Sequence, residues 1–176
     1  MAGRKVIFAA ALAALLSSGS SASNYPDPCV ALTARALSFI RDRQLQKVRV
    51  ALVSDPANAE SAEESAQVRA SFGSGVAIAN IHLTLVEVPI DRIENAGDVD
   101  VIWVTRGLKN NYRRVATVAN REHALSVSRD LDCVQQAYCV LGVQAEPSVK
   151  IILSASAASQ AGIAFQPAFR MMVTER

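Results

Sequence analysis

The stretch that decides the fold lies in the last third of the chain and contains two of its three cysteines. It runs through His123-Ala-Leu-Ser-Val-Ser128, the loop Cys133-Val-Gln-Gln-Ala-Tyr-Cys139, the segment Val149-Lys-Ile-Ile-Leu-Ser154 and the small-residue segment Ala155-Ser-Ala-Ala-Ser-Gln-Ala-Gly-Ile163. The β-rich segments on either side of the cysteine loop predict strands, and the small residues predict a short helix that ends at Gly162. Together they form one supersecondary unit.

Upstream of this unit, apolar periodicity predicts alternating strands and helices. Strands are expected at residues 48–53, 81–88 and 99–104, and helices at residues 30–45, 60–72 and 110–120. The run Val99-Asp-Val-Ile-Trp-Val104 is nearly all apolar, which is typical of a strand buried on both faces of a parallel sheet, with Trp103 in the core. We therefore expect a single α/β domain over residues 24–176, a small sandwich with a mostly parallel sheet of about five strands flanked by helices.

The first residues have the organisation of a secretory signal peptide. Arg4 and Lys5 precede an apolar run at residues 6–16, and Ser21-Ala22-Ser23 offers the small residues that a signal peptidase reads. The apolar run is too short for a transmembrane helix, which needs ~20 residues. We expect residues 1–23 to be removed and the mature chain to work in the periplasm.

The expected mature chain has balanced charge. Removing residues 1–23 from 176 leaves 153 residues, and the loss of Arg4 and Lys5 reduces Lys plus Arg from 18 to 16, equal to the 16 Asp plus Glu. This balance gives no general attraction to nucleic acid or to anionic lipid. The remaining length is enough for one domain with its own core.

The three cysteines allow three single-disulfide pairings. Proximity in the sequence favours Cys133 with Cys139 in an oxidising compartment, and Cys29 is then left over. Closing so small a loop would stabilise the fold by about 2 kcal/mol in the chain-entropy picture. No metal site or cofactor is expected, because His123 near this loop lacks the closely spaced partner ligands of zinc sites.

No motif indicates catalysis. The two histidines, His82 and His123, lie within or at the start of predicted strands, with no nucleophile elbow or paired carboxylate beside them. The Gly73-Ser74-Gly75 segment follows a predicted helix and precedes a strand, which is the reverse of a phosphate-binding loop and fits a helix C-cap. We expect a protein that is not an enzyme.

One group of polar residues is a candidate ligand site. Four residues follow two predicted strands, at the edge where open α/β sheets place their ligands: Ser54, Asp55, Thr105 and Arg106. The pair Asp55-Pro56 is equally a standard turn before a helix. The sequence therefore leaves two interpretations of this edge, a ligand-binding site or a helix-entry turn.

Two further groups are candidates for contact with a protein partner. A local basic cluster, which would suit an acidic partner but also fits a solvated helix face, consists of Arg106, Lys109, Arg113 and Arg114. An apolar tail, which would pack on the sheet or present a partner surface, contains Phe165, Phe169, Met171 and Met172. The sequence leaves both alternatives open.

The C-terminal unit and the strand before it resemble the YfiR-like periplasmic proteins. The segments that carry the resemblance are Val101-Ile-Trp-Val-Thr105, Ala124-Leu-Ser-Val-Ser128, the cysteine-containing loop and Lys150-Ile-Ile-Leu-Ser-Ala-Ser-Ala-Ala-Ser-Gln-Ala-Gly-Ile163. The order of elements agrees from Val48 to Met172, and the resemblance is most specific over the C-terminal unit.

The resemblance implies an α/β periplasmic domain that binds the sensor region of an inner-membrane diguanylate cyclase and represses it, so that cyclic di-GMP signalling and biofilm formation respond to the envelope. It also implies a disulfide in the loop that Cys133 and Cys139 occupy. The alternative is a periplasmic small-molecule binder that uses the strand C-terminal edge. We expect the partner to be the periplasmic domain of a membrane protein, and we expect no binding to nucleic acid and no membrane insertion after signal cleavage. The formation of a homodimer is left open.

Overall fold

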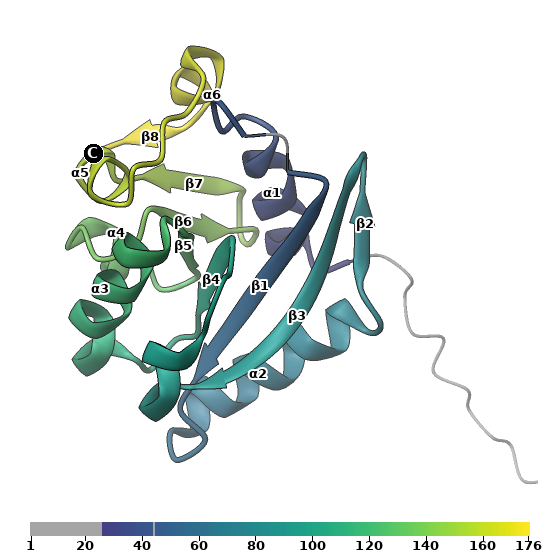
Figure 1. Ribbon diagram of the computed structural model, residues 1–176, viewed down its shortest axis with the longest axis vertical. Coiled ribbons are helices and arrows are strands. Elements are labelled where there is room, and N and C mark those ends of the chain that lie inside the picture. The colour runs from purple at the N-terminus through teal and green to yellow at the C-terminus, as the bar shows by residue number, and fades with distance from the viewer. Residues whose placement is uncertain (1–25, 44) are drawn as a thin grey trace, which may run out of the picture.

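The computed structural model describes residues 26–43 and 45–176, which form one sheet with helices on both faces (Figure 1). The predicted signal peptide, residues 1–23, lies outside the described residues. Within the described part of the chain, no helix has the length and apolar character needed to cross a membrane.

The helices, with the two 3₁₀ helices η1 and η2 in their places, are α1 (Pro28–Leu37), α2 (Ala59–Phe72), η1 (Ile90–Asn95), η2 (Lys109–Asn111), α3 (Tyr112–Glu122), α4 (Leu131–Gln135), α5 (Ala155–Gln160) and α6 (Pro167–Met172). The strands are β1 (Lys47–Ser54), β2 (Val76–Ile78), β3 (Ile81–Pro89), β4 (Val101–Val104), β5 (Leu125–Ser128), β6 (Leu141–Gln144), β7 (Lys150–Leu153) and β8 (Thr174–Glu175).

The sheet has eight strands in the order β2-β3-β1-β4-β5-β6-β7-β8. The five central strands, β3 to β6 in this order, are parallel, whereas β2 and β7 run antiparallel to their neighbours β3 and β6. The chain passes from β1 to β3 on one side and later to β4 on the other. The carboxyl ends of the parallel strands therefore meet at one edge, which includes a topological switch point.

The prediction of an α/β domain with a mostly parallel sheet is confirmed, but the expected count of about five strands is wrong. The strands that the sequence did not predict are β2, β6 and β8, which have only three, four and two residues. Such short segments show no measurable alternation, and they become strands because an established neighbour offers free backbone groups.

The core has two halves, one on each face of the sheet. Alternate residues of β1 and β4 point to opposite faces: Val50 and Trp103 join the apolar cluster under α1, α2 and the C-terminal segment, whereas Ala51 and Ile102 join the cluster under η1, α3 and α4. Because β4 is buried on both faces, its nearly continuous apolar run was a correct indicator of its central position.

The first helix is shorter than its periodicity predicted. The spacing suggested residues 30–45, but α1 ends at Leu37 and the chain then turns, with Asp42 at a positive φ of 60°. Ile40 forms an isolated bridge with Phe165, so this apolar residue packs on the C-terminal segment without being helical. Apolar spacing alone cannot distinguish these two ways of burying the same side chains.

The caps of α2 follow the sequence. Asn58 accepts a hydrogen bond from the Ser61 amide at its start, and Gly73, at a φ of 50°, closes its end. Asp55 accepts a hydrogen bond from the Ala57 amide, which is the turn expected before a helix. The Gly73-Ser74-Gly75 segment is therefore a helix end.

His123 does not start a strand, and that prediction is wrong. It is the left-handed C-cap of α3, with a φ of 51°, and β5 begins two residues later at Leu125. Its Nδ1 atom lies 3.1 Å from the Ala161 carbonyl oxygen, next to the end of α5. The residue joins the ends of two helices.

The disulfide between Cys133 and Cys139 is present, and that prediction is confirmed. The two Cα atoms are 5.2 Å apart, and both cysteines are buried in the cluster under α3 and α4. Cys29 is a free, buried cysteine in α1. The disulfide fastens the turn between α4 and β6, the strand that follows in the sheet.

Candidate functional site

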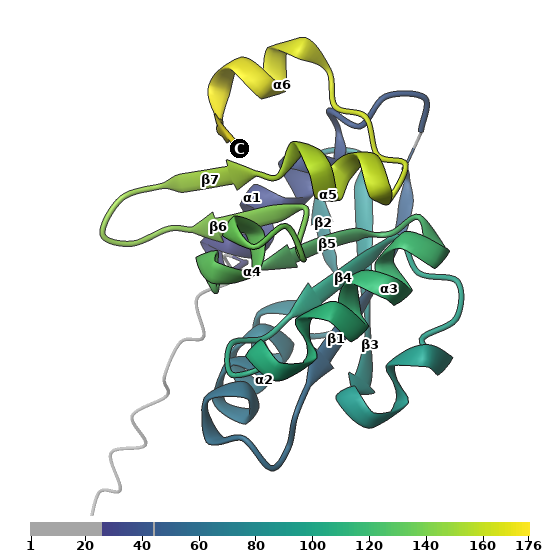
Figure 2. The same cartoon turned by 90° about the vertical axis from the view of Figure 1, so that its left-hand side faces the viewer.

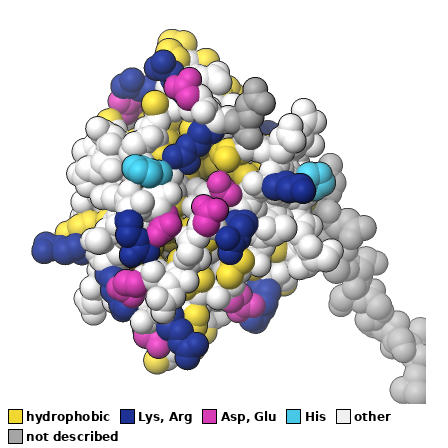
Figure 3. All heavy atoms as spheres, viewed as in Figure 1, with side chains coloured by type: hydrophobic (Ala, Val, Ile, Leu, Met, Phe, Trp, Pro, Cys, Tyr) yellow, Lys and Arg dark blue, Asp and Glu magenta, His cyan; other side chains and the backbone are white. Residues whose placement is uncertain are grey.

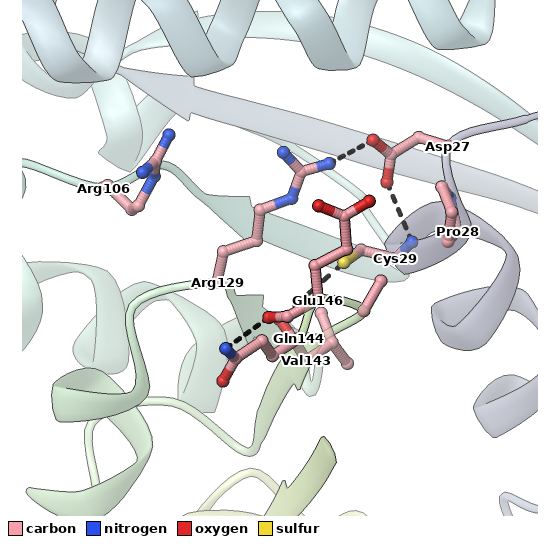
Figure 4. Close-up of a pocket in the computed structure, with 9 residues that line it drawn as sticks. Asp27, Pro28, Cys29, Arg106, Arg129, Val143, Gln144 and Glu146 are labelled. Carbon is pink, nitrogen blue, oxygen red and sulfur yellow. Dashed lines mark hydrogen bonds and ion pairs between the residues drawn. The ribbon is translucent and has the colours of Figure 1, made fainter. Parts of the chain in front are cut away.

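A pocket of about 510 Å³ opens at the carboxyl edge of the parallel strands (Figure 4). It lies beyond the ends of β4, β5 and β6 and beside the start of α1. Its lining residues are Asp27, Pro28, Cys29, Arg106, Arg129, Val143, Gln144, Ala145 and Glu146. We call it the strand-end pocket; its volume is within the range of about 300–1,000 Å³ that is usual for small-molecule sites.

The cation at the back of the strand-end pocket is Arg129, the first residue after β5. Only 16% of its side chain is exposed. Its Nη2 atom lies 2.5 Å from Asp27 Oδ2 and its Nε atom lies 3.8 Å from Glu64 Oε1, but neither nitrogen makes a well-aligned hydrogen bond. The guanidinium carbon lies 5.6 Å from the ring centre of Trp103, within cation–π range.

Glu64 does not line the strand-end pocket, but its fully buried side chain holds the two arginines that do. Its Oε1 atom accepts a hydrogen bond from the Trp103 indole at 3.1 Å, and its Oε2 atom accepts bonds from the backbone N–H and the Nε–H of Arg106 at 2.9 and 3.0 Å. A buried carboxylate is costly unless it is paired in this way. Glu64 thus fixes the loop after β4 against α2.

Asp27 connects the pocket to the N-terminal helix. Its Oδ1 atom accepts a hydrogen bond from the Cys29 amide at 2.8 Å as the N-cap of α1, and its Oδ2 atom pairs with Arg129. Burial acts to lower the pKa of Arg129, but the pairing with Asp27 and the nearby acidic groups outweigh burial and raise it. Arg129 is therefore charged at every accessible pH.

Cys29 lines the strand-end pocket as an un-ionised thiol. Burial raises the pKa of the Cys29 thiol, and the opposing charge of Arg129 does not cancel this effect. Its Sγ atom lies 3.9 Å from the Val143 carbonyl oxygen. A buried thiol with a raised pKa is a poor nucleophile, so the pocket has no activated attacking group at this position.

The predicted ligand site is only partly assembled by the structure. Of Ser54, Asp55, Thr105 and Arg106, only Arg106 lines the strand-end pocket. Thr105 is fully buried, with its hydroxyl 2.6 Å from that of Ser61 and 2.9 Å from the Val53 carbonyl oxygen. The strand-end pocket lies at the same edge of the sheet as these residues, but farther along it, beside β5 and β6.

The predicted basic cluster is largely neutralised by acidic neighbours. Arg106 pairs with Glu64, Lys109 with Asp132, and Arg114 with Glu94, and Arg113 projects from the exposed side of α3. On the face shown in Figure 3, basic and acidic side chains are interspersed. These charges contribute a mixed polar surface, which is the solvated-face alternative given above.

Sequence reasoning did not find Asp27, Glu64, Arg129 or Glu146. Arg129 could have been found by the rule that selected Arg106, because it also follows a predicted strand. Glu64 had a weaker signal: it falls on the stripe of α2 that also contains Ser61, Val68 and Phe72, all of them buried. Asp27 and Glu146 are brought to the pocket only by the tertiary fold.

A second exposed feature is the C-terminal tail. Met171 and Met172 of α6 are 82% and 65% exposed, whereas Phe169 on the same helix is buried and stacks on Phe39 and Phe165. Hydrophobic side chains are visible at the top of Figure 3, where α6 lies in Figure 1. One side of α6 therefore packs on the core, and the methionine side faces solvent.

Comparison with known proteins gives the fold and no family. No protein-family model and no curated protein sequence matches the chain. A conserved domain protein from Vibrio cholerae O1 biovar eltor has a similar structure, with a TM-score of 0.57 and 16% identity over 83% of this chain and 59% of that one. The ABC domain in complex with L-Trp from Streptococcus pneumonia is similar with a TM-score of 0.58 and 10% identity, over 84% of this chain and 60% of that one.

These similarities extend to the α/β fold alone, because both identities are low. The chain spans about three-fifths of the length of each of the two solved structures.

Proposed function

We propose that this protein is a non-enzymatic regulator of the YfiR-like type, which binds the periplasmic sensor region of an inner-membrane diguanylate cyclase and represses it. The observation that carries the proposal is the C-terminal unit: the disulfide-closed turn, the β6–β7 hairpin and the short α5 that ends at Gly162. The cysteine loop, β7 and α5 belong to the segments on which the sequence resemblance rests. A stable disulfide also favours an oxidising compartment such as the periplasm.

The surface that best suits the partner is the exposed side of α6. Met171 and Met172 project from a helix that is anchored by Phe169, and methionine side chains adapt to the shape of a partner. Figure 2 shows α6 standing out beyond β7 and α5, where a second protein can approach it. The extent of repression is set by how much more tightly this surface binds the inactive state of the cyclase than the active state.

The test is cross-linking in intact cells followed by capture of the tagged chain. We expect a membrane diguanylate cyclase to be captured, and the yield to fall strongly for the double variant Met171→Ser, Met172→Ser. Val149→Ser is the matched control, because Val149 is also a large exposed apolar residue but lies on the β6–β7 hairpin. Failure to retrieve any cyclase, from cells in which the tagged chain is folded and exported, contradicts the proposal.

The disulfide gives the proposed regulator a route to redox control. Reduction would free the turn that joins α4 to β6 and alter the outer shape of the C-terminal unit. Alkylation mass spectrometry on protein from the native envelope checks this directly. The redox proposal is abandoned if both thiols are found free there.

A second candidate function is the binding of a small molecule, and the strand-end pocket favours it. The pocket lies where open α/β sheets bind ligands, and it presents charged groups over an apolar wall. The similar domain from Streptococcus holds L-Trp, which shows that one protein of this fold carries a small ligand. A ligand-dependent rise in melting temperature would support this function.

A further inference from the structure

The strand-end pocket presents two guanidinium groups to its interior. Arg129 lies against Asp27 and Glu64 through its buried Nη2 and Nε atoms, and it also lines the pocket. Arg106 uses its Nε atom on Glu64, and its side chain remains 38% exposed at the pocket. Guanidinium groups bind carboxylates in a planar, often bidentate geometry, so this side of the pocket suits a carboxylate.

The same pocket also presents carboxylates. In Figure 4 the Glu146 carboxylate is directed to the region of Arg129 and Asp27, with Arg106 on the other side of Arg129. Among the described residues Glu146 has no ion-pair partner, while its backbone oxygen accepts a hydrogen bond from the Gln144 side chain at 2.5 Å. A simple anion would be repelled by Glu146 and Asp27, and a simple cation by the two arginines.

The third component is an uncharged wall. Val143 at the end of β6 is itself buried in the core, and beside it Pro28 from the start of α1 and Ala145 after β6 face the pocket. These side chains can cover the apolar body of a small molecule, while the charged groups orient its polar end. The volume of about 510 Å³ leaves room for both parts.

We propose that the strand-end pocket binds a small zwitterion, a molecule of the free amino acid class, with its carboxylate on Arg106 and Arg129 and its ammonium on Glu146 and Asp27. This inference rests on the second candidate function, small-molecule binding, and is independent of cyclase repression. Asp27 then acts at both ends of the site: it caps α1 and it faces the ligand, so binding tightens the N-terminal helix against the sheet.

The test starts with the mature chain and the twenty common L-amino acids in a thermal-shift screen. Each amino acid that raises the melting temperature is titrated by calorimetry beside two analogues, its amine without the carboxylate and its acid without the ammonium; for tryptophan these are tryptamine and indole-3-propionate. We expect each single-charge analogue to bind at least about tenfold more weakly, because one set of charged hydrogen bonds is missing.

Variants locate the site. Arg106→Gln and Glu146→Gln remove exposed charges on opposite sides of the pocket and should each weaken binding by about tenfold or more. Arg69→Gln is the matched control, since Arg69 is also an exposed arginine paired with a glutamate, Glu87, but lies on α2 away from the pocket. Arg129→Gln should abolish binding. Because Arg129 is largely buried, this variant is used only if its circular dichroism spectrum matches that of the wild type.

Two results overturn the inference, and they are distinguishable. If single-charge carboxylates bind as tightly as amino acids, the pocket binds small molecules of another class and only the zwitterion assignment fails. If none of the amino acids or analogues binds, the second candidate function fails with it.

Discussion

At the scale of single residues, Glu64 makes the most concentrated set of contacts around the strand-end pocket. One carboxylate receives hydrogen bonds from an indole, a backbone amide and a guanidinium, and lies near a second guanidinium. Donor groups and a second guanidinium therefore surround the buried Glu64 carboxylate and compensate its negative charge. Removal of the carboxylate would leave Trp103 and Arg106 without their common acceptor and Arg129 without a nearby negative charge.

Glu64→Ala should lower the free energy of unfolding by roughly 3 kcal/mol, because it breaks a buried charged network from one side. Glu60→Ala is the control: Glu60 lies on the same helix, 3.7 Å from the same Arg106, but its side chain is 54% exposed. Its loss should cost less than about 1 kcal/mol. Urea denaturation of both variants measures the difference, and equal costs would show that the Glu64 network does not stabilise the fold.

The carboxyl group of Glu175 gives a prediction about pH. The hydrogen bond from Arg170 lowers the pKa of Glu175, which means that the pair is fully formed above the ordinary glutamate pKa and is lost as the pH falls through the lowered one. An NMR titration should give a midpoint below that of an unpaired glutamate. The midpoint should rise in Arg170→Gln and in high salt, because both groups are exposed; an unchanged midpoint in Arg170→Gln would contradict the pairing.

At the scale of elements, the chain builds its C-terminal unit from very short pieces that depend on their ends. The helix α5 has six residues and finishes in a Schellman motif, with the Gly162 amide donating to Ser159 and the Ile163 amide to Ala158. Gly162 has a φ of 66° and lies against His123, the C-cap of α3. The ends of α3 and α5 are therefore in contact at Gly162, which has no side chain to separate them.

Gly162→Ala should destabilise the fold by about 2 kcal/mol, through the left-handed backbone and the added contact. An added Cβ would lie 3.1 Å from His123 Nδ1. Gly97→Ala isolates the backbone part, because Gly97 has a similar φ of 69° and open space around it, and should cost about 1 kcal/mol. Thermal or urea denaturation measures the loss of unfolding free energy in both variants. A smaller loss for Gly162→Ala than for Gly97→Ala would show that the contact with His123 does not add to the cost.

The disulfide between Cys133 and Cys139 is the second feature that stabilises this unit. The double variant Cys133→Ala, Cys139→Ala should lose about 2 kcal/mol of unfolding free energy, because the unfolded chain regains the freedom of the closed loop. Reduction of the wild type in urea should give a similar loss. The same reductant should leave the double variant unchanged, and a wild type that is equally stable in both redox states would show that the bridge contributes nothing.

At the scale of the whole molecule, the features of the fold that were predicted correctly are those specified by residues close together in the sequence. The apolar run of β4, the glycine C-cap of α2, the end of α5 and the cysteine pairing could all be predicted from neighbouring residues. Strands β6 and β8 and the early end of α1 could not, because each depends on a partner elsewhere in the chain, whereas β2 pairs with the β3 strand that follows it but has too few residues to show alternation. Ile40 is an example: its apolar character was visible, but its bridge to Phe165 was not.

The same division applies to the strand-end pocket. Its edge follows from strand direction, and Arg106 was selected on that basis. Its other charged groups and the carboxylate that supports them come from separate elements: Asp27 precedes α1, Glu146 follows β6, and the supporting Glu64 belongs to α2. Only the packing of α1 and α2 on the same face of the sheet brings these charges together, and no local pattern in the sequence records that packing.

The proposal that the chain represses a diguanylate cyclase is tested most directly by the intracellular level of cyclic di-GMP. Deleting the protein should raise this level, and the wild-type chain supplied in trans should restore it. The double variant Met171→Ser, Met172→Ser should be exported and folded but should not restore it. A level that is unchanged or lower after deletion would contradict the account.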